Sequence, residues 1–179
     1  MRLSQTVLRG RAHKFGDDVD TDQIIPAKYA IYSLDEKVLG EHAMEGVPDK
    51  GEGWAKTVTP GDLLVGGSNF GCGSSREIAP VAIRAAGVAG VVADSFANIF
   101  YRNSINLGFP ILESPAAAEG IEDGDELEID LEAGVIRNFT KGDEYRAEAF
   151  PEFIRELIDM GGLVPWVRRR LEQQETAAR

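Results

Sequence analysis

The chain has 179 residues, 43% of them apolar and 27% charged, which is enough for one globular domain with a sizeable core. Lysine and arginine number 19 against 30 aspartates and glutamates, and the net charge of -11 disfavours nucleic acid and anionic membranes as partners. One cysteine, Cys72, and two histidines, His13 and His42, are too few for a disulfide, a structural zinc site or an iron–sulfur cluster. Catalytic chemistry must therefore come mainly from other side chains or from another chain.

The N-terminus lacks the apolar run of a signal peptide, and the longest aliphatic stretch, residues 88–93, is too short to cross a bilayer. We therefore expect a cytoplasmic protein with no membrane partner. We also expect one domain over residues 1–179, because two folding units of half this length would each be marginal.

Four aspartates crowd the stretch 17–22, directly before Ile24-Ile25-Pro26. A calcium loop starting at Asp18 would need glycine and glutamate where Gln23 and Tyr29 stand, so a solvated turn is the expected structure.

Residues 29–57 show no firm periodicity and predict a long, flexible surface excursion, a kind of segment that often forms a substrate lid. Near its start lie a cation and several partly apolar side chains, a set suited to closing over a small, partly apolar anion: Lys28, Tyr29, Ile31 and Tyr32. His42 is expected to be a surface residue.

From residue 62 onward, short apolar runs alternate with helical segments. The pattern predicts an α/β fold with a parallel βαβ core, its strands at 62–66, 88–93 and 109–112 and its helices at 77–86 and 96–107. Alternating apolar and acidic residues at 127–131, a turn at 132–134 and the run 135–136 then predict an added antiparallel hairpin with one wet face. Helical spacing returns at 153–158, before an exposed basic segment at 167–171.

A glycine-rich segment, residues 66–75, separates the first strand of this core from its helix and predicts a backbone cradle for an anion. It is not a phosphate loop of the Walker type, because Cys72 replaces the required lysine. A dinucleotide fingerprint fails because Arg76 occupies the third glycine position, but Asp94 lies where a ribose-binding acid would be, so a nucleotide- or phosphate-binding module remains an alternative. Cys72 has no histidine placed to activate it and is expected to be a packed thiol.

Two hydroxyls and a guanidinium follow in succession at Ser74, Ser75 and Arg76. On spacing alone Ser74 and Glu77 form a capping box. Pro80 argues against that interpretation, because a helix starting after Ser74 would place a proline in its second turn. We expect the helix to begin near Glu77, which leaves Ser74 to Arg76 facing a ligand, and the planar fork of Arg76 suits a carboxylate.

Three strings in order along the chain resemble the small subunits of the isopropylmalate dehydratases: DTDQIIP (20–26), GSNFGCGSSRE (67–77) and FYRNSIN (100–106). These enzymes belong with aconitase and homoaconitase among the iron–sulfur hydro-lyases. The resemblance implies a swivelling domain of β/β/α layers and a separate large subunit that carries a 4Fe-4S cluster.

The resemblance also implies roles in isomerising 2-isopropylmalate and 3-isopropylmalate by dehydration and rehydration, a step of leucine biosynthesis. Ser74 would be the base, Ser75 and Arg76 would hold a carboxylate of the small dicarboxylate substrate, and iron on the partner would take the departing hydroxyl. The apolar segment 29–32 resembles the isopropylmalate type, since homoaconitase-like members place an arginine there.

Alternatives remain at this level. An apolar wall discriminates alkyl groups by only about 1–3 kcal/mol per methylene, so citramalate and dimethylmalate also fit the segment 29–32. A homoaconitate hydro-lyase subunit is a further alternative within the family. A purely structural or regulatory subunit, in which residues 74–76 only cap a helix, belongs to a different class of function.

Overall fold

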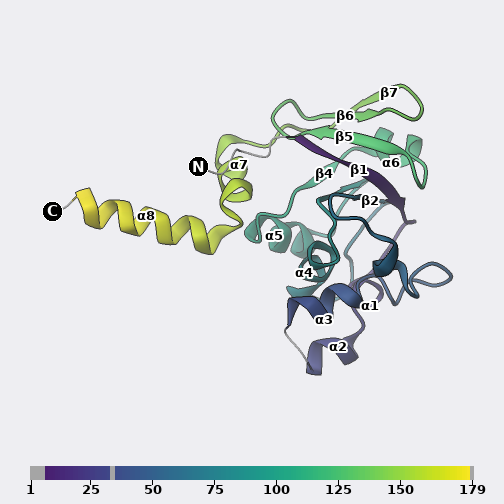
Figure 1. Cartoon of the computed structure of the whole chain (residues 1–179), viewed down its shortest axis with the longest axis horizontal. Coiled ribbons are helices and arrows are strands. Elements are labelled where there is room, and N and C mark those ends of the chain that lie inside the picture. The colour runs from purple at the N-terminus through teal and green to yellow at the C-terminus, as the bar shows by residue number, and fades with distance from the viewer. Residues whose placement is uncertain (1–6, 33–34, 178–179) are drawn as a thin grey trace.

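The computed structural model in Figure 1 describes residues 7–32 and 35–177, without the side chains of residues 30–32, 175 and 177. Its centre is a seven-stranded sheet in the order β4-β3-β2-β1-β5-β6-β7. Strand β1 divides this sheet, because its neighbour on one side is parallel and its neighbour on the other side is antiparallel.

The parallel half confirms the predicted βαβ core. Strands β2 and β3 are buried at every position, as expected for parallel strands that are covered on both faces. The half consists of β1 (Val7–Lys14), β2 (Leu63–Gly66), α4 (Ile78–Ala85), β3 (Gly90–Ala93), α5 (Asn98–Asn106) and β4 (Ile111–Glu113).

The antiparallel half contains the predicted hairpin, β5 (Glu126–Asp130) and β6 (Val135–Asn138), and adds an unpredicted strand, β7 (Asp143–Arg146). The expected wet face is wrong at Glu128, which is buried like Leu127 and Ile129 on either side of it. Arg9 of β1 donates to Glu128 over 2.6 Å and Arg137 of β6 donates over 2.7 Å. These two arginines, chiefly Arg137, lower the pKa of Glu128 and compensate its burial.

The segment 27–57, which includes the predicted surface excursion 29–57, is more regular than its sequence suggested. It contains the short helices α2 (Ala27–Tyr32), α3 (Glu36–Glu41) and η1 (Trp54–Thr57), and Leu39, Met44 and Trp54 are buried in the core. Helix α3 packs tightly on α4: a Cβ atom at Gly40 would lie 2.6 Å from the carbonyl carbon of Ala85. Helices of four to six residues show too few turns for a period to emerge. Flexibility of this segment stays a prediction.

The layers follow from the curl of the sheet. Helix α6 (Pro115–Gly120) contacts both β3 and β7, and the Ser114 hydroxyl donates to the Arg146 carbonyl over 2.8 Å. The antiparallel strands therefore fold back over the parallel ones, while α1 (Thr21–Ile24), α3 and α4 lie on the other side in Figure 1. This arrangement agrees with the predicted β/β/α swivel-type fold.

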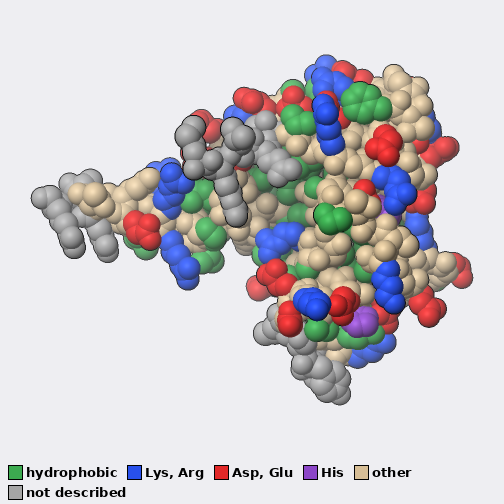
Figure 2. Space-filling model, viewed as in Figure 1, with side chains coloured by type: hydrophobic (Ala, Val, Ile, Leu, Met, Phe, Trp, Pro, Cys, Tyr) green, Lys and Arg blue, Asp and Glu red, His purple; other side chains and the backbone are tan. Residues whose placement is uncertain are grey.

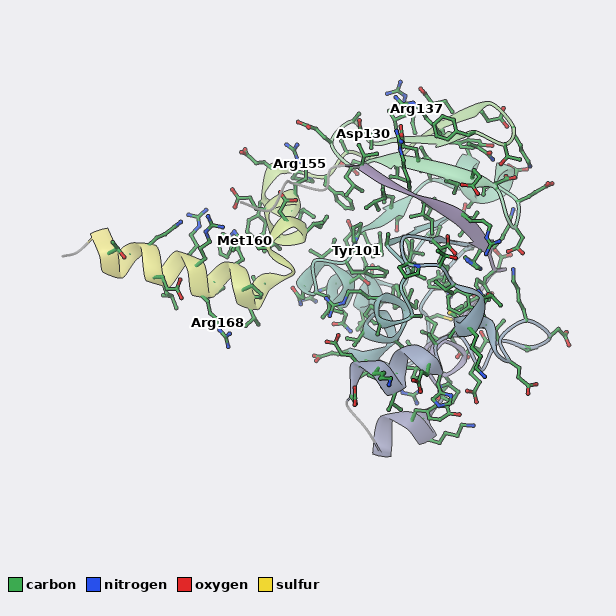
Figure 3. All side chains as sticks on the ribbon, viewed as in Figure 1. Tyr101, Asp130, Arg137, Arg155, Met160 and Arg168 are labelled. Atoms are coloured by element: carbon green, nitrogen blue, oxygen red, sulfur yellow. The ribbon has the colours of Figure 1, made fainter. Side chains whose placement is uncertain are left out.

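The C-terminal part is helical, as predicted, and breaks at the two glycines after Met160. Helix α7 (Glu152–Met160) ends at Gly161, whose φ of 77° glycine tolerates readily. Helix α8 (Leu163–Ala177) then projects from the body, and Arg168 points away from the sheet (Figures 1 and 3). No helix among the described residues is long and apolar enough to cross a membrane.

A buried histidine links β1 to η1 and to Asp62, the residue before β2. His13 Nε2 lies 2.8 Å from Asp62 Oδ2, and the Trp54 indole donates to His13 Nδ1 over 3.1 Å. Because Nδ1 must accept from Trp54, the ring proton lies on Nε2 and is donated to Asp62. His13 is thus a satisfied core residue.

Candidate active site

The glycine-rich loop between β2 and α4 is held from two sides. On one side the Gly71 amide donates to the Val19 carbonyl and the Thr21 amide donates to the Cys72 carbonyl, each over 2.8 Å. On the other side the Phe70 backbone pairs with that of Phe96, which follows β3. Segments that are distant in sequence therefore fix the path of the loop.

The loop needs glycine where it passes over helix α5. Gly71 has a φ of 79°, and a Cβ atom there would lie 2.2 Å from Cγ of the buried Phe100. A larger residue would meet both backbone strain and a clash, so the close approach of loop and helix depends on this position.

Ser74 lies exposed on the loop, with its hydroxyl 3.0 Å from that of Thr21. The Ser74 amide also donates to Thr21 Oγ1 over 3.1 Å. Thr21 is buried in α1, so its hydroxyl has a fixed position below Ser74. A hydroxyl has two lone pairs and one proton, so Thr21 Oγ1 accepts from the amide and still has both a donor and an acceptor for Ser74 Oγ; either hydroxyl can be the donor of that bond.

Ser74 is not the cap of α4, so the capping-box interpretation is wrong. The helix begins at Ile78 after Glu77, which makes no side-chain capping bond. Pro80 then falls in the first turn, where a missing amide costs nothing. The expectation that residues 74–76 stay in the loop is confirmed.

Arg76, like Ser74, is held by residues of α1 and its C-cap. Its Nη1 atom donates to Asp22 Oδ1 over 2.5 Å and to the Ile25 carbonyl over 3.3 Å. A guanidinium has five N–H donors, and both of these bonds start from one nitrogen. The geometry therefore fixes the orientation of Arg76 and keeps other donors for an anion.

Lys28 and Tyr29 lie on α2 and meet at one carboxylate rather than at the loop. Glu45 Oε1 accepts from the Tyr29 hydroxyl over 2.7 Å and from Lys28 Nζ over 3.2 Å. Within the described residues, no hydrogen bond joins Lys28 or Tyr29 to Ser74 or Arg76. The side chains of Ile31 and Tyr32, also predicted to bind substrate, fall outside the described part.

His42 is not an isolated surface residue. Its ring stacks on Tyr29 with 3.8 Å between centroids, and its Nδ1 lies 2.5 Å from Glu45 Oε2. Burial alone would raise the pKa of Glu45, but donors on Tyr29, His42 and Lys28 outweigh it and lower that pKa below its ordinary value.

The thiol of Cys72 is poorly suited to act as a nucleophile. Burial raises its pKa, and the nearby carboxylates of Asp20 and Asp18 raise it further. Among the described residues, no group of three or more histidine, cysteine, aspartate or glutamate side chains is arranged to hold a metal ion.

The acidic turn and Asp94 support the loop. Asp17 Oδ1 accepts from the Ser68 amide over 2.8 Å, and Asp94 Oδ2 accepts from the Ser68 hydroxyl over 2.7 Å. The carboxylate that a nucleotide site would need for a ribose is therefore engaged by the loop itself.

A cavity of about 330 Å³ lies apart from the loop, beside β1, and is lined by Arg11, Lys50, Trp54 and Asp123 among others. Lys50 is paired with Asp123 over 2.6 Å. Opposite charges compensate each other there, so the cavity does not favour a particular ion.

Comparison with known proteins identifies the family. A model of the aconitase C-terminal domain matches residues 27–116. The 3-isopropylmalate dehydratase small subunit of Caldanaerobacter subterraneus subsp. tengcongensis is 52% identical over 92% of this chain and 99% of its own length. The chain belongs to the family of 3-isopropylmalate dehydratase small subunits.

Two archaeal relatives extend the comparison. The isopropylmalate/citramalate isomerase small subunit of Methanocaldococcus jannaschii is 45% identical over 96% of this chain and 99% of its own length. A crystal structure of 3-isopropylmalate dehydratase from the same organism superposes with a TM-score of 0.87 at 43% identity, covering 96% of this chain and 99% of that one. The similarity to these relatives therefore covers nearly the whole chain, in structure as well as in sequence.

In this dehydratase small subunit, sequence reasoning missed Thr21 and Asp22 as parts of the site. Both lie in the string DTDQIIP, which carried the resemblance without an assigned role. The capping box of Asp20 and Gln23 shapes α1 so that Thr21 faces Ser74 and Asp22 faces Arg76. The sequence signal that could have indicated them is a hydroxyl and a carboxylate side chain directly after the helix N-cap Asp20.

Proposed function

We propose that this chain contributes a proton-transferring serine and a carboxylate clamp to a cytoplasmic, heteromeric hydro-lyase that interconverts 2-isopropylmalate and 3-isopropylmalate. The observation that carries the proposal is the 3.0 Å distance between the hydroxyls of Ser74 and Thr21. Ser74 lies on the loop that also carries Arg76, and Thr21 lies on α1. The names of the relatives support the choice of substrate.

Ser74 acts as the base in this proposal. Its Oγ takes the proton from the carbon next to a substrate carboxylate, the electron pair of that C–H bond forms the double bond, and the hydroxyl leaves from the adjacent carbon. In the reverse direction Ser74 returns the proton. A serine is a weak base unless its alkoxide is stabilised, and the Thr21 hydroxyl is placed to supply that stabilisation.

Arg76 and Ser75 bind the carboxylate next to the carbon that loses its proton. Asp22 keeps the guanidinium in place before substrate arrives, so little side-chain entropy is lost on binding. A carboxylate held by both residues sets the C–H bond toward Ser74.

The departing hydroxyl needs an electrophile, and the described residues form no metal site that could act as one. The family implies an iron–sulfur cluster, which supplies a Lewis acid when present, but the described residues offer no set of ligands for one. We therefore assign the cluster to a separate large subunit, with the substrate bound between the two chains.

Helix α2 selects the alkyl group of the substrate. Lys28, Tyr29, Ile31 and Tyr32 lie on it, and this largely apolar set suits an isopropyl group better than a further carboxylate. Citramalate is the nearest competitor, because its methyl group also fits an apolar surface.

Reconstitution with a cluster-bearing large subunit tests the proposal. We expect dehydratase activity only after mixing, with kcat/KM highest for isopropylmalate, lower for citramalate and lowest for homoaconitate. Arg76→Lys should raise KM about tenfold, since a lysine cannot form the two parallel bonds of the guanidinium. Homoaconitate as the preferred substrate, or no activity after mixing, would contradict the proposal.

A further inference from the structure

Glu45 binds three side chains on two different segments. Its Oε1 atom accepts from Tyr29 over 2.7 Å and Lys28 over 3.2 Å, both on α2, while its Oε2 atom pairs with His42 over 2.5 Å. Tyr29 also stacks on His42, so ring contact and hydrogen bonds act on the same pair of segments. Donors and acceptors are therefore matched around one carboxylate, which makes this a specific attachment for α2.

The backbone around Glu45 is itself fixed to α1. The Met44 amide donates to the Ile24 carbonyl over 2.6 Å, and the Gly46 amide donates to the Gln23 carbonyl over 3.0 Å. A Cβ atom at Gly46 would lie 2.6 Å from the Asp22 carbonyl oxygen, so the two segments are in close contact. Glu45 thus stands on a turn clamped to the helix that bonds Ser74 and Arg76.

These contacts form a continuous connection from the catalytic loop to α2. Thr21 and Asp22 of α1 bond the loop, the backbone of α1 bonds the turn, and Glu45 on the turn bonds Lys28 and Tyr29. These contacts hold α2 relative to Ser74, although no hydrogen bond joins the described side chains of α2 to Ser74.

We propose that Glu45 is a positioning residue for substrate selectivity, which holds the alkyl-selecting helix α2 in register with the Ser74 loop. The inference rests on the proposed function, because it assigns α2 to the alkyl group of the substrate. Glu45 touches no substrate. It acts through Lys28 and Tyr29, whose positions decide how well an isopropyl group is enclosed.

Kinetics of the reconstituted enzyme test this role. Glu45→Ala should raise KM for isopropylmalate about tenfold and leave kcat within about twofold, because loss of the anchor weakens binding and not the chemical step. The ratio of kcat/KM between isopropylmalate and citramalate should fall about fivefold, since the smaller methyl group depends less on a formed pocket. Glu45→Gln keeps an acceptor for Tyr29 and should recover part of the ratio.

A double-mutant cycle with Tyr29→Phe checks that Glu45 acts through α2. Tyr29→Phe removes one donor and keeps the ring on His42. If both residues act through the same bond, the double variant should raise KM by less than the product of the increases in the two single variants. Glu41→Ala, at an exposed glutamate of α3, is the matched control and should change neither KM nor the ratio. Multiplicative effects, a fall in kcat with KM unchanged, or an unchanged ratio in Glu45→Ala would overturn the proposal.

An assay without turnover separates this proposal from the proposed function. In hydrogen exchange on the full chain, the amides of residues 27–32 should exchange faster in Glu45→Ala than in the wild type or Glu41→Ala. If the wild-type enzyme turned over neither substrate, the proposed function would fail, and exchange alone would decide whether Glu45 holds α2. Equal exchange in all three proteins would overturn the anchoring.

Discussion

Ser74 and Thr21 are 53 positions apart in the chain, yet their hydroxyls lie within hydrogen-bonding distance. A buried threonine hydroxyl 3.0 Å from an exposed serine hydroxyl favours negative charge on the serine oxygen, because a serine oxygen without its proton can only accept and the threonine O–H is within reach to donate. The chemistry assigned to Ser74 therefore depends on a residue from a different segment.

Replacing Thr21 by valine isolates this contribution. Thr21→Val keeps the shape of the side chain but removes the hydroxyl, so kcat should fall about tenfold to a hundredfold while KM changes little. Steady-state kinetics of the reconstituted enzyme provide the measurement. Thr21→Ser retains the hydroxyl and should keep most of the turnover; equal losses in both variants would point to packing instead.

At the level of single residues, residue type and local spacing indicated candidates for the site but not the partners of those candidates. Ser74 and Arg76 could be selected because hydroxyl and guanidinium groups after a glycine loop suit a carboxylate ligand. Their partners Thr21 and Asp22 could not, because contacts between distant segments leave no local pattern. Lys28 shows the same limit: its charge was visible in the sequence, but its pairing with Glu45 was not.

At the level of elements, the loop between β2 and α4 keeps its shape through Gly71. Gly71→Ala would place a methyl group against Phe100 at a φ of 79°, so the free energy of unfolding should fall by about 2–4 kcal/mol. Urea denaturation measures this change. Gly16→Ala, where an added Cβ meets no atom within 4 Å, is the matched control, and an equal effect at both positions would refute the role assigned to Gly71.

Elements were predictable where they are long or buried. The strands and helices of the parallel core follow from apolar runs bounded by glycine, and Pro80 located the start of α4. Strand β7, with exposed and charged residues, carries no such signal. The short helices of the segment 27–57 were not predicted. Helix α3 packs on α4, and Leu39, Met44 and Trp54 of this segment are buried in the core, so tertiary contacts that local sequence does not encode support these helices.

At the level of the whole molecule, the net charge is strongly negative. Figure 2 shows acidic and basic side chains interspersed on the viewed face, although the sum is -11. An anionic substrate must therefore be attracted over short distances by fixed cations such as Arg76, since the overall field opposes its approach.

The same acidic composition predicts how stability depends on pH. Burial alone would raise the pKa of Asp62, but His13 and the amides of Thr59 and Arg11 outweigh it, and Arg137 lowers the pKa of Glu128. A carboxyl group whose pKa is lower in the folded state stabilises the fold above its unfolded pKa, and this stabilisation disappears as pH falls through the folded value. The free energy of unfolding should therefore decline as pH falls below about 4.5.

Urea denaturation between pH 6 and pH 3 measures this decline. Asp62→Asn cannot ionise and should show a shallower dependence than the wild type. A flat profile for the wild-type chain over this range would contradict the contribution assigned to the paired carboxylates.

We infer that this chain forms half of an active site, with the base and the carboxylate clamp on this chain and the electrophile on a partner. Turnover of Ser74→Ala, mixed with the large subunit at saturating isopropylmalate, tests that division most directly. We predict unchanged assembly with the large subunit and a kcat lower by about a thousandfold, the scale of a lost general base. Turnover near the wild-type rate in an intact complex would contradict the account.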